Sequence, residues 1–327
     1  MTGTPIANRP YDLWAQVWFL DQGVSLGTSF PDFKRAANLS NDLASNSQRR
    51  NSFEETLAAL HSRIARFAVR ETKAGGVIQL PEKVVEAVPA EWEPEQLRLY
   101  EKVRKQTWAE IVHNGVPLRD DSDELVKRLT RLLQIASNPY LVDESYNAEP
   151  GKLAPTERIV KQIMDAKEKC ILWTGFVDNV EWLAKKFRSF GTVRIHGRMK
   201  QDDRETSLQQ FLHKPDANIL IATPGSAKEG LTLTVANHVL FYDRSFSLDD
   251  YLQAQDRIHR ISQKKVCHVY NVIMHNSIDE WIDYLLDAKH LAAQLAQGDI
   301  SEEQYASRMS YDYGEIVHDI LSSGAEA

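Results

Sequence analysis

The amino-acid sequence predicts an α/β protein, in which a parallel sheet is preceded by a mainly helical region. Beyond residue 150, apolar segments that resemble strands alternate with helical patterns, and successive strands begin about 20–28 residues apart. This spacing suits strand–helix–strand crossovers, which join parallel strands. The strands are apolar throughout, which indicates a sheet covered on both faces. The five predicted strands are residues 170–174, 192–196, 218–222, 238–242 and 266–273.

The start of the chain favours helices. Residues 1–20 contain an aromatic-rich segment that predicts a loop followed by a helix. Residues 38–52 are polar and lack an apolar period, which predicts a mobile loop. Ser52 and Glu55 fit a capping box, so the next helix is expected to begin there. Its apolar positions recur at helical spacing at Phe53, Leu57, Leu60, Ile64 and Phe67.

Extended chain and two more helices are predicted before the first strand. Residues 77–90 contain prolines and have the pattern of extended chain, and amphipathic helices are predicted at 94–113 and 122–136. Asn138-Pro139 ends the second helix, since the residue before a proline avoids helical backbone angles. A loop with Pro150, Gly151 and Pro155 then divides the chain.

Helical patterns also connect and follow the strands. They occupy residues 178–190, 200–213 and 248–261, and a final helix is expected from Ser277 to about Gln297. The tail that follows, residues 298–327, is acidic and weakly patterned.

Composition and charge exclude several classes of protein. The chain has 327 residues, of which 43% are hydrophobic and 26% charged, so it is neither disordered as a whole nor a disulfide scaffold with its 2 cysteines. Cys170 and Cys267 lie in apolar strands, which favours buried reduced thiols. No apolar run approaches the length that spans a bilayer, and no secretory signal opens the chain. We therefore expect a cytoplasmic protein with no membrane partner.

The net charge of −7 excludes a globally basic nucleic-acid binder. Residues 291–327 hold seven acidic residues and one basic residue, so residues 1–290 carry a net charge of −1. Any contact with nucleic acid must therefore come from local patches on a nearly neutral body.

Residues 253–265, QAQDRIHRISQKK, are the most informative segment. Tyr251, Ala254, Ile258 and Ile261 are expected to form an apolar stripe on a helix, with Gln253, Asp256, Arg257 and Arg260 on another face. Two neighbouring arginines repel each other unless acids or an external anion neutralise them. Guanidinium groups suit phosphate because they bind it in a two-pronged way. The alternative is a solvated helix face whose arginines pair with nearby acids.

A glycine-containing loop at residues 222–233 follows a strand directly. Gly225 and Gly230 have the spacing of a phosphate-binding loop, but Leu231 and Thr232 follow where Lys and Ser or Thr are required. The strand that ends in Asp243 continues with Arg244 rather than a second acid. The printed sequence thus lacks the triphosphate cradle and acid pair of an autonomous P-loop ATPase. A plain turn remains an alternative for this loop.

The turn at residues 195–199 places His196, Gly197 and Arg198 at the end of a strand, where they either contact a phosphate or simply form a turn. We find no Ser-His-Asp or Cys-His arrangement, and no Cys or His spacing that predicts a metal site.

Taken together, these segments resemble the Swi/Snf-type branch of helicase superfamily two. TGTPIANRPYDLWAQVWFLD resembles the third helicase motif with its following helix, and LHSRIARFAVRETK with LPEK resembles the exit from the first motor lobe. EPEQLRLYEKV and RLLQIASNPYLV are similar to the helical insertion of this branch. ILWTGF, ATPGSAKEGLTLT and QAQDRIHRISQ resemble motifs four, five and six. The likeness is collinear to about residue 290, and the segment resembling motif six is the most specific.

The resemblance implies two RecA-like lobes with ATP and Mg between them, moving along double-stranded DNA. It implies that Arg257 and Arg260 are arginine fingers, and that Gly230, Gln253 and Asp256 line the nucleotide. It further implies that Thr2, Gly3 and Thr4 couple hydrolysis to lobe movement. The positions implied to contact DNA are Thr174, His196, Gly197, Arg198, Thr223 and Lys228.

The chain also departs from the family pattern. Lys228-Glu229 stands in place of a glycine pair, Phe246-Ser247-Leu248 in place of Trp-Asn-Pro, and Ser262 where glycine is common. These changes favour a compact bacterial or phage-type member. The sequence begins inside the segment resembling motif three, so we expect the nucleotide cradle and magnesium ligands on a missing N-terminal lobe.

The expected domains follow from this reading. Residues 1–80 would end the first RecA-like lobe, 81–150 would form the helical insertion and linker, 151–290 the second RecA-like lobe, and 291–327 an acidic tail. The favoured function is the C-terminal motor lobe of a DNA-dependent ATPase, inactive without its partner lobe. The alternatives are a non-catalytic DNA- or protein-binding module and a different α/β enzyme, such as a sugar-nucleotide transferase.

Overall fold

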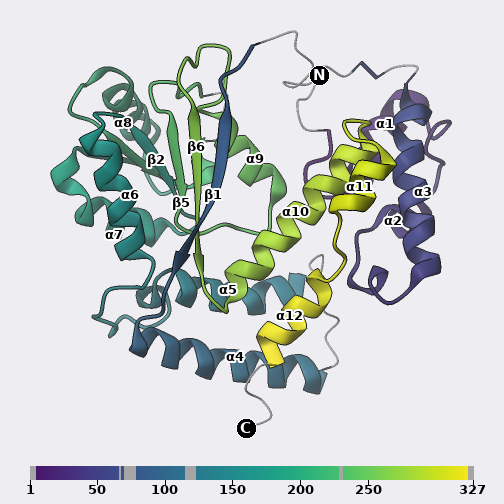
Figure 1. The fold of residues 1–327 in the computed structure, drawn as a ribbon, viewed down its shortest axis with the longest axis horizontal. Coiled ribbons are helices and arrows are strands. Elements are labelled where there is room, and N and C mark those ends of the chain that lie inside the picture. The colour runs from purple at the N-terminus through teal and green to yellow at the C-terminus, as the bar shows by residue number, and fades with distance from the viewer. Residues whose placement is uncertain (1–4, 66–67, 70–78, 115–122, 228–230, 323–327) are drawn as a thin grey trace.

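The computed structural model describes residues 5–65, 68–69, 79–114, 123–227 and 231–322. Its centre is a single all-parallel sheet with the strand order β1-β6-β5-β2-β4-β3 (Figure 1). The strands are β1 (Lys83–Ala90), β2 (Cys170–Trp173), β3 (Thr192–Ile195), β4 (Ile219–Ala222), β5 (His238–Phe241) and β6 (Cys267–Met274). Every residue of β2 and β4 is buried, and so is every residue of β5. The predicted α/β class with a parallel sheet is confirmed.

Helices cover both faces of this sheet, as the uniformly apolar strands predict. These helices are α6 (Leu153–Asp165), α7 (Val177–Lys186), α8 (Gln201–His213), α9 (Leu248–Asp256) and α10 (Ile278–Ala296). Buried side chains of α6, α7 and α10 join one hydrophobic cluster, and those of α8 join the other; α9 contributes Leu248 to the first cluster and Ala254 to the second. The sheet is thus the middle layer of three.

One predicted helix ends early. The helix expected over residues 248–261 ends at Asp256. The Arg257 carbonyl accepts from the backbone N–H of Leu233 at 2.9 Å, and the Ile258 carbonyl accepts from the Gln263 side chain at 3.1 Å. These acceptors are therefore taken by partners outside a regular helix. The predicted stripe is wrong at its last position, since Ile261 is 73% exposed.

The extended segment expected at residues 77–90 contributes the edge strand of the sheet. β1 runs parallel to β6, with Lys83 opposite Cys267 and Ala90 opposite Met274. Pro89 is compatible with this position, because an edge strand has one side without ladder partners. The sheet therefore has six strands, one more than the five predicted.

Short helices precede the sheet: η1 (Pro10–Asp12), α1 (Leu13–Asp21), α2 (Phe30–Ala37), η2 (Asn41–Leu43) and α3 (Ser47–Ile64). The predicted mobile loop at residues 38–52 is wrong, because α3 already begins at Ser47. Its N-cap is Asn46, whose side chain accepts from the Arg49 N–H at 3.0 Å, so the cap is not at Ser52. The first turns of α3 face solvent and need no apolar period, whereas Phe53 and Leu57 are buried. Phe67 lies outside the described residues.

Further helices lie between β1 and α6 or follow α10. They are α4 (Pro94–Asn114), α5 (Asp123–Ser137), η4 (Pro139–Leu141), α11 (Glu302–Arg308) and α12 (Tyr313–Ser322). α10 leaves the sheet and packs against α3, and α12 packs against α4 (Figure 1). The expectation of a weakly patterned tail is wrong, because Tyr305 and Leu321 are buried and Tyr311 donates a hydrogen bond to Glu54 at 2.8 Å.

Candidate functional site

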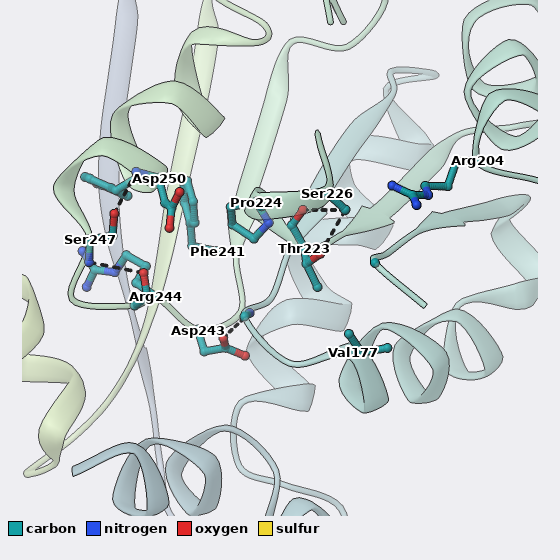
Figure 2. Close-up of a pocket in the computed structure, with 15 residues that line it drawn as sticks. Val177, Arg204, Thr223, Pro224, Ser226, Phe241, Asp243, Arg244, Ser247 and Asp250 are labelled. Carbon is teal, nitrogen blue, oxygen red and sulfur yellow. Dashed lines mark hydrogen bonds between the residues drawn. The ribbon is translucent and has the colours of Figure 1, made fainter. Parts of the chain in front are cut away.

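A cavity of about 410 Å³ opens where four parallel strands end (Figure 2). Gly175 follows β2, Gly197 follows β3, Thr223 follows β4 and Asp243 follows β5, and all four line it. The carboxyl edge of an open α/β sheet is where such folds usually bind ligands. We call this space the rim cavity. It brings together Gly197 and Thr223, two positions that the sequence analysis selected.

The rim cavity also receives the beginning of α7. Val177 is the first residue of this helix and lines the cavity, and the N-cap residue Phe176 makes no side-chain cap. The first N–H groups of a helix lack intrahelical partners and carry its positive dipole end. An anion at this place would find both donors and a favourable field.

Arg204, on α8, lines both the rim cavity and a neighbouring groove of about 520 Å³. Its Nε donates to the Met199 carbonyl at 3.1 Å. Within the part of the chain that the structure describes, no carboxylate oxygen lies within salt-bridge distance of its guanidinium. Sequence reasoning missed this residue. The available signal was an arginine one turn into the helix that follows the His196-Gly197 turn.

Thr174 does not present its hydroxyl to the rim cavity. The residue is fully buried, and its Oγ1 donates to Oδ2 of Asp243 at 2.6 Å. Thr223 is nearly buried as well, and its Oγ1 donates to Ser226 Oγ at 2.9 Å. Both hydroxyls thus serve internal acceptors in this structure, and their implied roles toward DNA remain predictions.

His196 and Arg198 are held by acids of α7. His196 is 5% exposed, and its Nε2 lies 2.7 Å from Oε1 of Glu181. Arg198 is exposed, and its Nη1 donates to Asp178 at 2.6 Å. Arg198 can exchange its exposed partner for another anion, since such surface pairs contribute little free energy.

The two arginines of the Q-A-x-D-R-x-H-R-I segment lie beside the chain that follows β4. Nη1 of Arg257 donates to the Leu231 carbonyl at 3.4 Å, and Nη1 of Arg260 donates to Thr232 Oγ1 at 2.9 Å. Burial and the neighbouring Arg260 lower the pKa of Arg257, whereas Asp256 raises it. The protein therefore keeps two cations close together on a partly buried turn, an arrangement that an anion would stabilise.

The other implied nucleotide and coupling positions are only partly described. Gln253, on α9, donates to Asp249 Oδ1 at 2.7 Å, and the Asp256 carbonyl accepts from Nε of Arg260 at 3.2 Å. The positions that lie outside the described residues are Thr2, Gly3, Thr4, Lys228 and Gly230.

The described parts of the chain also bear on metal binding and on membrane insertion. No group of three or more His, Cys, Asp and Glu side chains there is arranged to hold a metal ion. No helix among those residues is both long and apolar enough to cross a membrane.

Two family models match the chain. An SNF2-related domain matches residues 1–141, and a helicase conserved C-terminal domain matches residues 154–262. Together they account for about three quarters of the sequence. The chain thus contains an SNF2-related domain followed by a helicase conserved C-terminal domain, which confirms the resemblance to the Swi/Snf-type helicases, and strands β2 to β5 lie in the second of these domains.

Several curated proteins are similar over most of this chain. YwqA of Bacillus subtilis is 27% identical over 299 residues, which are 88% of this chain and 31% of that protein. The ISWI chromatin-remodeling complex ATPase ISW2 of Saccharomyces cerevisiae is 24% identical over 86% of this chain and 25% of its own length. The chain thus spans about a quarter to a third of these relatives.

Solved structures show the same fold. The Sulfolobus solfataricus SWI2/SNF2 ATPase C-terminal domain has a TM-score of 0.53 and 21% identity, covering 72% of this chain and 98% of that one. The SWI2/SNF2 ATPase core of the same organism, solved in complex with dsDNA, has a TM-score of 0.54 and 24% identity, covering 91% of this chain and 64% of that one.

Proposed function

We propose that this chain is the C-terminal motor lobe of a DNA-dependent ATPase that translocates on double-stranded DNA. In this proposal the rim cavity holds a backbone phosphate, and Arg257 and Arg260 act on ATP held by a first lobe. The observation that carries it is the rim cavity itself. An uncapped helix start, the guanidinium of Arg204 and the open turn at Gly197 converge there.

The chemistry of the rim cavity favours a phosphate over a sequence-reading contact. Backbone N–H groups at the start of α7 and the positive helix end recognise charge rather than base edges. Arg204 adds a cation without a carboxylate partner among the described residues, and Arg198 stands nearby on the surface. Such contacts position a duplex without reading its sequence.

The two arginines fit the chemistry of phosphoryl transfer. A nucleotide with Mg bound between two lobes would supply the phosphoryl group and its charge. Arg257 and Arg260 would neutralise the charge that builds on that group, the part that arginine fingers play in related reactions. The phosphate-binding loop and Mg ligands would belong to the first lobe, on a longer form of this polypeptide or on a partner.

DNA binding by this chain alone is the first test. We expect a fluorescently labelled short duplex to bind, with an affinity that falls steeply as salt rises. Arg204→Ala should reduce the slope of log K against log salt by about 0.9, the value for one phosphate contact. Lys265→Ala is the matched control, because Lys265 pairs with Glu168 before β6, at the opposite edge of the sheet. Equal slopes for the wild-type chain and the Arg204 variant would contradict the assignment.

ATP hydrolysis is the second test. We expect DNA-stimulated turnover only when a nucleotide-binding first lobe of the family is supplied. DNA binding without any turnover in the completed protein would instead favour the alternative, a non-catalytic DNA-binding module. If the completed protein shows no DNA binding and no turnover, both functions are contradicted.

A further inference from the structure

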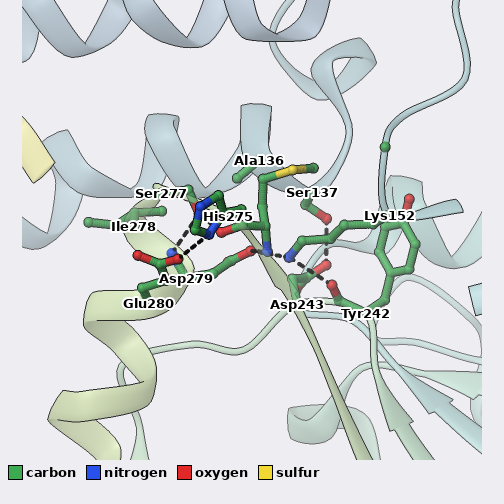
Figure 3. Close-up of polar contacts among 12 residues, drawn as sticks. Ala136, Ser137, Lys152, Tyr242, Asp243, His275, Ser277, Ile278, Asp279 and Glu280 are labelled. Atoms are coloured by element: carbon green, nitrogen blue, oxygen red, sulfur yellow. Dashed lines mark hydrogen bonds and ion pairs between the residues drawn. The ribbon is translucent and has the colours of Figure 1, made fainter. Parts of the chain in front are cut away.

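Asp243 is a buried carboxylate that lies between the rim cavity and the helical insertion. It follows β5, is 3% exposed and lines the cavity. Its Oδ1 accepts from the Gly175 N–H at 2.6 Å (Figure 2), and its Oδ2 accepts from Ser137 Oγ at 2.7 Å (Figure 3) and from Thr174 Oγ1 at 2.6 Å. Three short hydrogen bonds therefore converge on one carboxylate, and Asn179 Nδ2 adds a longer one to Oδ2 at 3.5 Å.

These donors come from two different parts of the fold. Thr174 and Gly175 form the turn between β2 and α7, so they determine where the start of α7 enters the rim cavity. Ser137 is the last residue of α5, in the helical insertion. The Ser137 hydroxyl also accepts from Asn179 Nδ2 at 2.7 Å, which adds a second link between α5 and α7. The carboxylate thus joins the cavity rim to the end of α5.

A fixed counter-charge lies beside this carboxylate. Lys152 is fully buried, and its Nζ donates to the Tyr242 carbonyl at 3.0 Å and lies 2.5 Å from Oδ2 of Asp279 (Figure 3). Burial raises the pKa of Asp243 and outweighs the effect of Lys152 and the three short hydrogen bonds, which lower it. An ionised carboxylate is the form that can accept three hydrogen bonds at once, so the arrangement depends on this charge.

The turn lies close against this carboxylate. A Cβ added at Gly175 would lie 3.2 Å from Oδ1 of Asp243, which is tighter than ordinary packing. An anion that pulls on the start of α7 would therefore shift the Gly175 N–H and Thr174 hydroxyl against the carboxylate. The third partner of that carboxylate is Ser137, so the end of α5 would respond.

We infer that Asp243 is a positioning residue that couples occupancy of the rim cavity to the end of the helical insertion. The inference rests on the proposed binding of a DNA phosphate in that cavity. Asp243 aims the start of α7 at the phosphate through Thr174 and Gly175, and it transmits the contact to α5 through Ser137. The arrangement gives the insertion a direct mechanical connection to the duplex.

The experiment measures duplex affinity and amide hydrogen exchange on the full chain. With wild-type protein, the short duplex should slow exchange at α5 as well as at α7. Ser137→Ala should keep the affinity within about threefold but abolish the slowing at α5, because it removes the hydroxyl that donates to Asp243 and accepts from Asn179. Ser62→Ala is the control, since this serine near the end of α3 donates only to its own helix.

Asp243→Asn tests whether the carboxylate positions the start of α7. The amide cannot accept from all three donors, so affinity should fall about tenfold or more while the far-ultraviolet circular dichroism stays unchanged. A merely structural carboxylate would lower the unfolding midpoint but leave the affinity of folded protein and the exchange response at α5 unaltered. If Asp243→Asn does not fold, Thr174→Val replaces it, with Thr174→Ser as the control that keeps the hydroxyl.

The outcomes separate the two proposals. A wild-type chain that does not bind the duplex overturns both. A wild-type chain that binds, without any change of exchange at α5, overturns the coupling alone. Unchanged affinity in the folded Asp243 variant, or in the Thr174→Val variant that replaces it, overturns the positioning role.

Discussion

Nζ of Lys152 lies 2.5 Å from the carboxylate of Asp279, and the two side chains are 0% and 4% exposed. Asp279 lies in the first turn of α10, and Lys152 immediately precedes α6, so the pair joins two helices that cover the same face of the sheet. The carboxylate also accepts from the Met274 N–H at 2.9 Å. Removing one partner of such a pair lowers the free energy of unfolding strongly, because the other charge then stays buried without its ion pair.

Removing the lysine charge should therefore be severe. Lys152→Met is expected to lower the free energy of unfolding by about 3–5 kcal/mol, the usual cost of leaving one buried charge unpaired. Urea unfolding followed by circular dichroism measures this loss. The double variant Lys152→Met with Asp279→Asn should recover part of it, and a loss below about 1 kcal/mol in the single variant would contradict the prediction.

Acid should destabilise the protein through Glu168 and His238. Burial raises the pKa of Glu168, but hydrogen bonds from Lys265, His238 and Asn237 outweigh it and lower the pKa to about 2 from 4.5. A depressed carboxyl pKa gives stability that is present above pH 4.5 and is lost as the pH falls toward about 2. Burial also lowers the pKa of His238 from 6.5. Below pH 6.5 the unfolded chain therefore binds this proton more readily than the folded protein, and the protein loses stability.

A single substitution measures what the Glu168 carboxylate contributes to the free energy of unfolding. Glu168→Gln should flatten the stability curve between pH 4.5 and about 2. Partial exposure screens these contacts, so we expect a contribution on the order of 1–2 kcal/mol at neutral pH. Chemical unfolding at a series of pH values measures it. Parallel curves for wild type and variant would show that Glu168 contributes no such stability.

Two glycines with positive φ should respond differently to alanine. Gly191 has φ 73°, and an added Cβ would lie 1.7 Å from the carbonyl oxygen of Asp216. Gly27 has φ 84°, but a Cβ there would meet nothing within 4 Å. Gly27→Ala should cost about 1–2 kcal/mol from backbone strain alone. Gly191→Ala should cost more than about 3 kcal/mol, because the backbone must also move. Equal melting temperatures for the two variants would rule out this explanation.

In the completed ATPase, Arg260→Ala should lower turnover by about 10³-fold or more while ATP still binds, by analogy with other arginine fingers. Arg257→Ala should behave similarly. Arg194→Ala is the control, because Arg194 lies on the edge strand β3 and pairs with Glu181 on the surface at 2.8 Å. Steady-state hydrolysis and nucleotide binding, measured on the same preparations, check the prediction. Retained turnover in both arginine variants would contradict it.

The central sheet could be predicted because β2, β4 and β5 are short apolar runs between helical patterns, a signal that local sequence carries. The sequence predicts only extended chain at β1, because most of its residues are partly or fully exposed and it contains Pro89. Only its long-range pairing with β6 makes it a strand. Likewise, no local signal predicts that the Leu233 N–H donates to the Arg257 carbonyl, a hydrogen bond that helps to end α9 at Asp256.

The candidate site was predictable only where a motif carried it. Gly197 and Thr223 stand at strand ends, so the parallel topology brings them together. Arg204 and the three donors of Asp243 depend on how separate helices pack, which spacing along the chain does not reveal. Thr174 shows the limit most clearly, since its hydroxyl serves a carboxylate 69 positions away in sequence.

The pairing of β1 with β6 has a consequence for biosynthesis. The strand at residues 83–90 pairs with residues 267–274, so its ladder forms only after residues 267–274 have left the ribosome. Until then β1 offers an unpaired backbone edge, which is a template for association with other chains. A nascent chain stopped before residue 267 would expose this edge. Such distant parallel pairing also makes folding slow, which lengthens the period in which a chaperone could protect the strand.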